Sequence, residues 1–239
     1  MARPRSRPLL DAVAAAFPEI ADPLQAISTG RVEIDGIVVT NPRSRVSADN
    51  RLRLVAEQRL RGEAKLRAGL DAFAISVADR VCLDVGAAAG GFTRVLVEGG
   101  ARLVYAVDAG HGQLLGSLRQ DPRVVNLEGV NVAALTTDMI KQAIAMVSID
   151  VSYLSLSAAV AQLDSVEIAA GADLVGLVKP MFELRRATAP TDRVDLDAAL
   201  AAASEGLIAA GWRVIAHIDS PVLGSRGAPE LLIHGRRTG

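Results

Sequence analysis

The fold is decided by a stretch in which a glycine-rich turn follows an apolar run, Val81-Cys82-Leu83-Asp84-Val85-Gly86-Ala87-Ala88-Ala89-Gly90-Gly91-Phe92-Thr93. The apolar run predicts a buried strand, and the residues from Thr93 to Glu98 predict a helix. Glycines allow a tight turn and let a ligand approach the backbone, and the first turn of a helix leaves N–H groups free to bind it. The stretch therefore predicts a nucleotide-type cofactor site, the alternative being a plain strand, turn and helix that binds nothing.

The order of the glycines indicates which cofactor binds. A dinucleotide site has the pattern G-x-G-x-x-G, in which the middle glycine lets a pyrophosphate approach. This chain has D-x-G-x-x-x-G-G from Asp84 to Gly91, typical of enzymes that bind S-adenosylmethionine, a ligand with a positive sulfonium and no phosphate. A second acid, Asp108, ends the next apolar run and is placed to accept hydrogen bonds from both ribose hydroxyls of an adenosine. Asp108 would suit NAD as well, so the choice rests on the glycine order.

Composition limits the class of protein. The chain has 239 residues, half of them apolar, which is enough for one large domain or for a large and a small one. Charges or prolines interrupt every candidate membrane helix, and Asp11 and Pro18 break an N-terminal run that would otherwise resemble a signal peptide. The single cysteine, Cys82, lies in a predicted buried strand, so disulfides are not expected. These features favour a cytoplasmic protein without membrane contact or a metal site.

Residues 1–58 are predicted to form a small α+β domain. Two helical patterns, residues 9–17 and 20–27, precede a hairpin with the turn dipeptide Asp35-Gly36, and a last strand is expected over Arg51–Val55. Residues 1–61 hold 10 Arg and 7 acidic residues, a balance of +3, which hints at contact with nucleic acid.

This N-terminal pattern resembles the RNA-binding domain named after protein four of the small ribosomal subunit. In that family the second helix and the hairpin grip structured RNA. The alternative is a small capping subdomain with no RNA role. On the resemblance, the arginines expected to contact RNA are Arg31, Arg43, Arg45, Arg51 and Arg53.

Residues 59–239 are predicted to form a doubly wound α/β sheet. Polar residues 56–64 make the expected linker, and apolar runs then alternate with helical patterns. A short loop around Ser220-Pro221 joins the last two runs and predicts an antiparallel hairpin, as in class I (Rossmann-like) methyltransferases. The seven strands are expected at Val81–Leu83, Leu103–Val107, Val124–Leu127, Met146–Ile149, Leu174–Val178, Trp212–Ile218 and Leu231–His234.

Four charged residues are expected to meet beyond the strand ends, where α/β sheets carry their reactive groups. Asp150 and Lys179 end the fourth and fifth strands, Glu230 begins the seventh, and Lys65 opens the first helix of the domain. Of the 26 basic residues only three are lysines, which suggests that lysine is kept where a side chain must be able to lose its proton. The set can position a ribose hydroxyl and supply a lysine of lowered pKa, although each residue alone could be a structural ion pair.

The acceptor that these residues suit is a ribose oxygen. Methyl transfer to a base amide nitrogen would call for an Asn-Pro-Pro-Tyr-like loop after the fourth strand, and transfer to a pyrimidine carbon would call for a nucleophilic cysteine. The chain has Asp150-Val-Ser-Tyr at the first place, and its only cysteine lies in the predicted core. For a ribose oxygen, the protein has only to align the acceptor with the sulfonium and remove a proton.

The set of Lys65, Asp150, Lys179 and Glu230 resembles the K-D-K-E tetrad of the FtsJ-like ribose 2′-O-methyltransferases. The whole chain is similar to the TlyA family, the rRNA cytidine-2′-O-methyltransferases also named hemolysins. Stretches that carry the resemblance include Asp84-Val-Gly86, Gly90-Gly91-Phe92-Thr93, Asp150-Val-Ser, Lys179-Pro-x-Phe-Glu183 and Ser220-Pro-x-x-Gly224.

The resemblance implies a cytidine ribose of ribosomal RNA as substrate, with Lys179 as the base. It implies ribosomal RNA or ribosomal subunits as partners, and a monomer is favoured. The residues that it assigns to S-adenosylmethionine are Asp84, Gly86, Ala88, Gly90, Gly91, Phe92, Asp108 and Asn131.

The chain departs from the family pattern at the cofactor loop and before the first lysine. The loop carries Ala88-Ala89 where the family usually has Ser-Thr, and Leu60-Arg61-Gly62-Glu63 replaces Ser-Arg-Gly-Gly. A second hypothesis is therefore a catalytically weak or inactive RNA-binding protein on a methyltransferase scaffold. A third, a membrane-lysing protein, has no amphipathic or spanning segment to support it.

Overall fold

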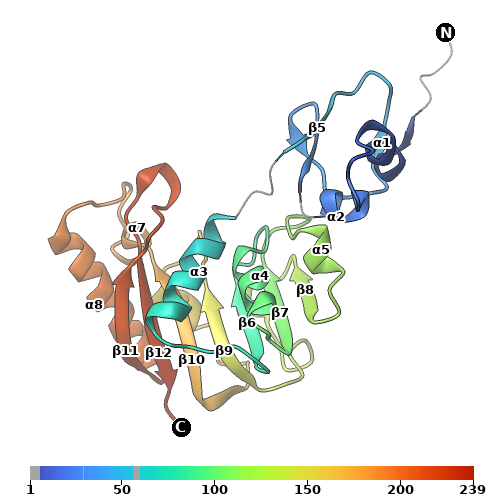
Figure 1. The fold of residues 1–239 in the computed structure, drawn as a ribbon. Coiled ribbons are helices and arrows are strands. Elements are labelled where there is room, and N and C mark those ends of the chain that lie inside the picture. The colour runs from blue at the N-terminus through green and yellow to red at the C-terminus, as the bar shows by residue number, and fades with distance from the viewer. Residues whose placement is uncertain (1–5, 29, 56–59) are drawn as a thin grey trace. The chain divides into compact units, whose positions relative to one another are not determined.

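The computed structural model describes residues 6–28, 30–55 and 60–239 (Figure 1). The chain divides into two compact units, one of residues 1–59 with 115–121 and one of residues 60–114 with 122–239. Each unit is described by itself.

The larger unit is built on the predicted seven-stranded sheet, in the order β11-β12-β10-β9-β6-β7-β8. β12 runs antiparallel to both of its neighbours and the other pairings are parallel, which confirms the Rossmann-like α/β class and the final antiparallel hairpin. The strands are β6 (Val81–Val85), β7 (Leu103–Asp108), β8 (Val124–Glu128), β9 (Ile144–Ile149), β10 (Ile168–Val178), β11 (Trp212–Asp219) and β12 (Leu231–Arg237).

Helices cover both faces of this sheet. Successive side chains of a strand point to opposite faces. Val175 of β10 lies under Gly69 of one helix, whereas a Cβ on the next residue, Gly176, would overlap with Leu156 of another. The helices are α3 (Arg61–Ala72), α4 (Gly91–Glu98), α6 (Leu156–Val160), α7 (Pro180–Glu183) and α8 (Arg193–Ala209), with short 3₁₀ turns η1 (Val132–Ala134) and η2 (Ser225–Gly227). Helix α5 (Gly116–Arg119) belongs to the smaller unit.

The start of α3 corrects two predictions. Leu60 precedes the helix, and its N–H donates to Glu63 Oε1 at 3.1 Å, which caps the first turn. The predicted linker 56–64 is therefore wrong over residues 61–64, and residues 56–59 lie outside the described part. Lys65 lies in the second turn of α3 rather than at its start.

The interior of the larger unit holds the only cysteine of the sequence, Cys82. It lies in β6, is fully buried, and burial raises the pKa of its thiol to about 12. A thiol with this pKa is almost entirely protonated at neutral pH and is a poor nucleophile.

A buried carboxylate, that of Asp173 in β10, lies at the amino end of the sheet. Asp173 accepts hydrogen bonds from Arg80 Nη1 at 2.7 Å, from Arg236 Nη2 at 2.8 Å and from His234 Nε2 at 2.8 Å. Burial acts to raise the pKa of Asp173, but the bonds from these three partners outweigh it and lower the pKa. The four residues are named the Asp173 cluster, and the ring of Phe73 stacks on His234 beside it.

The smaller unit has a three-stranded sheet in the order β3-β2-β5 and a separate strand pair, β1 with β4. Its core is formed by buried residues of the helices and strands, among them Leu9, Val13, Ile27 and Val32. The second helix begins at Pro23, three residues later than its apolar pattern predicts, because proline fits the first turn of a helix. The elements are β1 (Arg7–Pro8), α1 (Leu9–Ala16), α2 (Pro23–Ser28), β2 (Val32–Ile34), β3 (Ile37–Val38), β4 (Arg45–Val46) and β5 (Leu52–Leu54).

Candidate active site

Four charged side chains lie together beyond the carboxyl ends of the parallel strands, as their positions in the sequence predict. Asp150 follows β9, and Lys179 follows β10, where Pro180 begins α7. Glu230 precedes β12, and Lys65 reaches the same place from α3. Four separate segments of the larger unit thus bring their charges to one edge of the sheet.

Alternating charges join these side chains into what we name the ion-pair row. Lys65 Nζ lies 2.6 Å from Glu230 Oε2 and 3.8 Å from Asp150 Oδ2. Lys179 Nζ lies 2.6 Å from Asp150 Oδ1. The exposed fraction of the side chains runs from 6% for Glu230 to 20% for Asp150. Because the charges are paired this closely, their attraction offsets much of the cost of removing them from water.

Lys179 has an acceptor for each hydrogen of its ammonium group. Besides Asp150, it donates to the Val151 carbonyl oxygen at 2.8 Å and to Ser152 Oγ at 3.0 Å. These three contacts fix the direction of Nζ. Of the three acceptors, Ser152 Oγ is a neutral hydroxyl, so another hydroxyl can replace it while the ion pair of Lys179 with Asp150 stays intact.

Two neighbouring contacts keep the row in place. A Cβ at Gly224 would overlap with Glu230 Oε1, so glycine leaves the space that this carboxylate occupies. Glu183, at the end of α7, accepts hydrogen bonds from Leu156 N at 2.5 Å and from Ser157 Oγ at 2.8 Å. The helix that follows Lys179 is therefore tied to the first turn of α6.

A cavity of about 670 Å³ opens beside the two end members of the row. Lys179 and Glu230 line it, and so does Arg226 of the loop between β11 and β12, a residue that the sequence reasoning missed. Apolar walls are formed by Met181, Phe182, Ala187, Ala189, Ala228 and Pro229. The cavity combines a charged end with an apolar wall and is large enough for a nucleotide-sized group.

A second, smaller cavity is lined by Asp150 and the glycine-rich loop. Its walls are the first turns of α3 and α4 and the loop itself, and Asp150 supplies the carboxylate. A Cβ at Gly86, whose φ is +87°, would overlap with the backbone carbonyl of Asp150, so only glycine lets the two strand ends approach. The residues that line it are Leu60, Arg61, Gly62, Gly86, Ala87, Ala88, Ala89, Gly91, Phe92 and Asp150.

Asp84 does not line this second cavity. It is fully buried and accepts hydrogen bonds from Thr93 Oγ1 at 2.6 Å and from Ser148 Oγ at 2.9 Å. Burial raises the pKa of Asp84 to about 6, although the hydrogen bonds from Thr93 and Ser148 act to lower it. The acid of the D-x-G-x-x-x-G-G pattern therefore ties β6 to α4 and β9.

The remaining residues predicted to hold the cofactor border the loop or lie beyond β7. Asp108 Oδ2 accepts from Ala88 N at 2.8 Å and Oδ1 accepts from Gly110 N at 2.6 Å, which leaves each oxygen a further lone pair. Gly90, with φ of +96°, precedes α4, and Ala88 has a φ of +45°, which alanine rarely adopts. Asn131 is exposed and caps η1 by accepting from Ala133 N.

The arginines predicted to contact RNA lie in the smaller unit. Four of them are exposed and Arg31 is half-buried. Arg45 Nη2 donates to the Ser6 carbonyl oxygen at 2.6 Å, so part of its guanidinium is already bound. The exposed four are Arg43, Arg45, Arg51 and Arg53.

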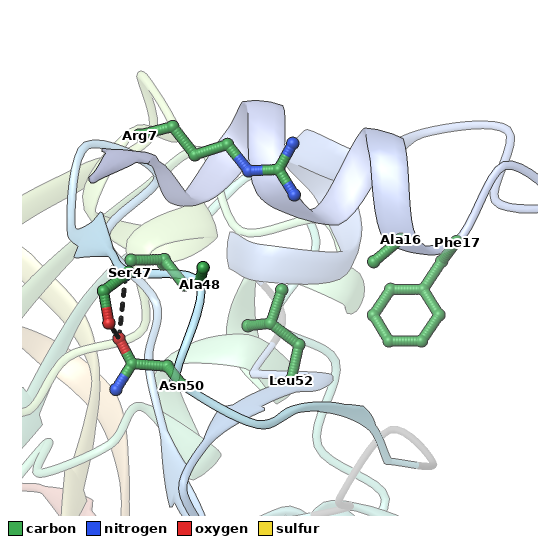
Figure 2. Close-up of a pocket in the computed structure, with 8 residues that line it drawn as sticks. Arg7, Ala16, Phe17, Ser47, Ala48, Asn50 and Leu52 are labelled. Carbon is green, nitrogen blue, oxygen red and sulfur yellow. Dashed lines mark hydrogen bonds between the residues drawn. The ribbon is translucent and has the colours of Figure 1, made fainter. Parts of the chain in front are cut away.

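None of the predicted arginines lines the pocket of this unit that Figure 2 shows. The pocket has an apolar side with Phe17 and Leu52, and Arg7 extends over it. On its polar side, Asn50 Oδ1 accepts from Ser47 N at 2.9 Å and Ser47 Oγ at 3.0 Å. These bonds lie within the turn of residues 47–50 that precedes β5 and stabilise it.

Comparisons with known proteins agree with this geometry. TlyA of Mycobacterium tuberculosis, a 16S/23S rRNA (cytidine-2′-O)-methyltransferase, is 39% identical over 218 residues, which cover 87% of this chain and 81% of the relative. A structure from Streptococcus thermophilus, provisionally named a hemolysin, has a TM-score of 0.72 and 31% identity, covering 99% of this chain and 90% of that one. An S-adenosylmethionine-dependent methyltransferase from Mesorhizobium loti, 17% identical with a TM-score of 0.52, shares the fold over 73% of this chain and 98% of its own.

Within residues 6–28, 30–55 and 60–239, no helix has the length and apolar character needed to cross a membrane.

The family model described as FtsJ-like methyltransferase matches residues 58–237. The chain therefore belongs to the TlyA family of FtsJ-like methyltransferases.

Proposed function

We propose that this protein transfers a methyl group from S-adenosylmethionine to the ribose 2′-oxygen of a nucleotide, a cytidine, in ribosomal RNA. The observation that carries the proposal is the ion-pair row, whose members line both a cavity at the glycine-rich loop and a nucleotide-sized cavity at Lys179. The TlyA relative supplies the substrate class, since it methylates cytidine in rRNA.

The residues around the loop fit S-adenosylmethionine. The loop cavity has mostly apolar walls, with one carboxylate, Asp150, and one guanidinium, Arg61. The carboxylate suits the positive sulfonium and amino group of the ligand, and the guanidinium suits the carboxylate of its methionine part. Asp108 is half-exposed at the end of β7 and keeps lone pairs for ribose hydroxyls. When bound, the cofactor supplies a methyl group on a sulfonium, which is already a good electrophile.

Within the proposal, the protein aligns the acceptor and removes its proton. The 2′-hydroxyl takes the place of Ser152 Oγ beside Lys179 Nζ, and Lys179 in its amine form accepts the proton as the oxygen bonds to the methyl group. Asp150 holds Nζ of Lys179 from one side. Lys65 in turn holds Asp150, and Glu230 holds Lys65. The row thus fixes the direction of the base, and it has no net charge once Lys179 has taken up the proton.

The smaller unit would supply the grip on the RNA. Its exposed arginines, Arg43, Arg45, Arg51 and Arg53, can contact phosphates without reading the sequence. We assign the catalytic step to residues 59–239, the RNA-binding role to residues 1–58, and the place of action to the cytoplasm, with ribosomal subunits as partners.

The direct test compares ribosomal RNA from cells with and without the gene by mass spectrometry of nucleosides. We expect 2′-O-methylcytidine to be lost with the gene and restored by the wild-type protein. Purified protein should also transfer methyl groups to unmodified ribosomal subunits. An unchanged content of 2′-O-methylated nucleosides, together with no transfer in vitro, would contradict the proposal.

A second candidate, an RNA-binding protein with little or no activity, is favoured by one observation. Ala88 and Ala89 line the loop cavity and offer the ligand no side-chain hydroxyl. Calorimetric titration with S-adenosylmethionine, with and without ribosomal subunits, separates the two candidates. Binding in either condition supports the enzyme, whereas RNA binding without any cofactor binding supports the second candidate.

A further inference from the structure

The loop between β11 and β12 carries an arginine in an unusual backbone conformation. Arg226 has φ of +57° and ψ of +27°, in the left-handed region that residues with a Cβ rarely adopt. Around it, Gly224 N donates to the Ala228 carbonyl oxygen at 2.8 Å, and Gly227 N donates to the Gly224 carbonyl oxygen at 3.3 Å. The turn therefore fixes Arg226 at its tip, and an outlier held in this way is a reason to look for a function.

The charges of the larger cavity leave Arg226 as the one cation without a matching acid. Lys179 pairs with Asp150, and Glu230 pairs with Lys65. Among the described residues, no carboxylate lies within ion-pair distance of Arg226, and its side chain is exposed at the edge of the cavity. The other charged residues that line the cavity, Lys179 and Glu230, each have a partner in the ion-pair row, so Arg226 is the cation that remains to attract an anion.

We infer that Arg226 binds a phosphate of the RNA strand beside the nucleotide whose ribose reaches Lys179. The inference rests on the proposed function and extends it to the orientation of the substrate. A guanidinium offers a planar pair of N–H donors that matches two phosphate oxygens. Phe182 and Pro229 line the same cavity and provide an apolar wall for the base. A single cavity thereby offers Arg226 to the phosphate, Lys179 to the neighbouring ribose and an apolar wall to the base.

The rigid turn gives this contact a positioning effect. Lys179 is fixed by three acceptors, and Arg226 is fixed by the backbone bonds of its turn. A phosphate held by Arg226 sets how far the neighbouring ribose can lie from Nζ. Arg226 is a binding residue in this scheme and takes no part in proton transfer.

The test uses substitutions that separate the charge of Arg226 from its backbone conformation. Arg226→Gly removes the guanidinium and suits the left-handed φ, so it does not harm the turn. Arg226→Lys keeps the positive charge but loses the paired donors. The matched control is Arg185→Gly, because Arg185 is also an exposed arginine with a left-handed φ, +51°, and does not line the cavity.

Steady-state methylation of ribosomal subunits is measured for each protein over a range of salt concentrations. For Arg226→Gly we expect the KM for RNA to rise on the order of tenfold, with kcat changed less than about twofold. The slope of log affinity against log salt should fall by about one unit for the lost phosphate contact. Arg226→Lys should keep that slope and part of the affinity, and Arg185→Gly should match the wild type.

The outcomes distinguish this inference from the proposed function. An active wild-type enzyme whose KM and salt slope are unchanged by Arg226→Gly overturns the inference alone. Equal losses in Arg226→Gly and Arg185→Gly also overturn it, since they indicate a general effect of positive charge. A wild-type protein that methylates no ribose overturns both.

Discussion

Two clusters of buried charge lie at opposite ends of one sheet and are built in opposite ways. At the amino end, the single carboxylate of Asp173 is surrounded by Arg80, His234 and Arg236. At the carboxyl end, two acids and two lysines alternate in the ion-pair row, and the row borders two cavities. A carboxylate surrounded by donors can only hold the fold together, whereas a row that ends in a lysine beside a cavity can also exchange a proton.

Asp84 sharpens the comparison because it is a buried acid with neutral donors. Its partners are the hydroxyls of Thr93 and Ser148, and burial raises its pKa to about 6. The side chain of Asp173 is also buried, but the hydrogen bonds that it accepts from Arg80, His234 and Arg236 lower its pKa. At Asp173 these bonds outweigh the effect of burial, whereas at Asp84 the two hydroxyl donors do not.

The largest expected effect comes from the carboxyl end. Lys179→Met removes the proposed proton acceptor, so methyl transfer should fall by about a thousandfold or more in a single-turnover assay. The midpoint of thermal unfolding should change little, because the partially exposed Asp150 keeps Lys65.

The matched control is Lys141→Met, since Lys141 is exposed and lies outside the helices and strands. If Lys179→Met retained most of its activity, the row would be as purely structural as the Asp173 cluster. That result would remove the distinction between the two ends.

The next effect belongs to the amino end and concerns stability. Asp173→Ala leaves the cationic partners with no carboxylate and should lower the free energy of unfolding by about 3–5 kcal/mol in urea titrations. Asp197→Ala is the control: its ion pair with Arg193 is more than half exposed and should be worth less than about 1 kcal/mol. Methyl transfer per folded molecule should be retained at low temperature, and its complete loss would contradict a structural role for this cluster.

A pH-dependent effect of similar or smaller size is expected at Asp84. Its folded pKa of about 6 exceeds the ordinary value of 3.8, so the folded state binds the proton more tightly than the unfolded state. The free energy of unfolding should therefore fall as pH rises between these values, by about 3 kcal/mol, and stay level above them. Asp84→Asn lacks this fall. Urea unfolding of the two proteins at pH 4.5 and 7.5 should reveal about 2 kcal/mol of it, since pH 4.5 already lies above the ordinary pKa of an aspartate. A constant difference between them would show that the pKa is not raised.

The smallest effect concerns the affinity for the cofactor. Ala88→Ser adds a hydroxyl to the loop cavity, and one new hydrogen bond of about 1 kcal/mol should tighten S-adenosylmethionine binding about fivefold in calorimetry. Ala74→Ser is the control, because Ala74 also has a left-handed φ, +52°, and does not line the cavity. Weaker binding by Ala88→Ser would show that the left-handed conformation at this residue, and not the missing hydroxyl, limits the site.

The sequence predicts the sheet well because its strands are buried apolar runs of the right length. It also predicts that Lys65, Asp150, Lys179 and Glu230 meet, because strand ends in such a sheet share one edge. It fails at the start of α3, where the polar residues Arg61 and Glu63 look like a linker until the capping of Leu60 by Glu63 is seen.

Other features depend on geometry that no local pattern reveals. Asp84 resembles a cofactor ligand in its motif, yet only the structure shows that Thr93 and Ser148 occupy its oxygens. Arg226 carries no signal in the sequence, since its position follows from a left-handed turn and from a cavity formed by distant segments.

The buried Cys82 makes this protein convenient for spectroscopy. Its thiol is inaccessible and protonated, so maleimide dyes or nitroxide spin labels should leave it unmodified in the folded state. A cysteine introduced at exposed Arg53 and another at exposed Ile208 would then be the only reactive sites, one in each unit. Distances between the two labels, recorded with and without ribosomal subunits, would report how the two units are arranged when the RNA is bound.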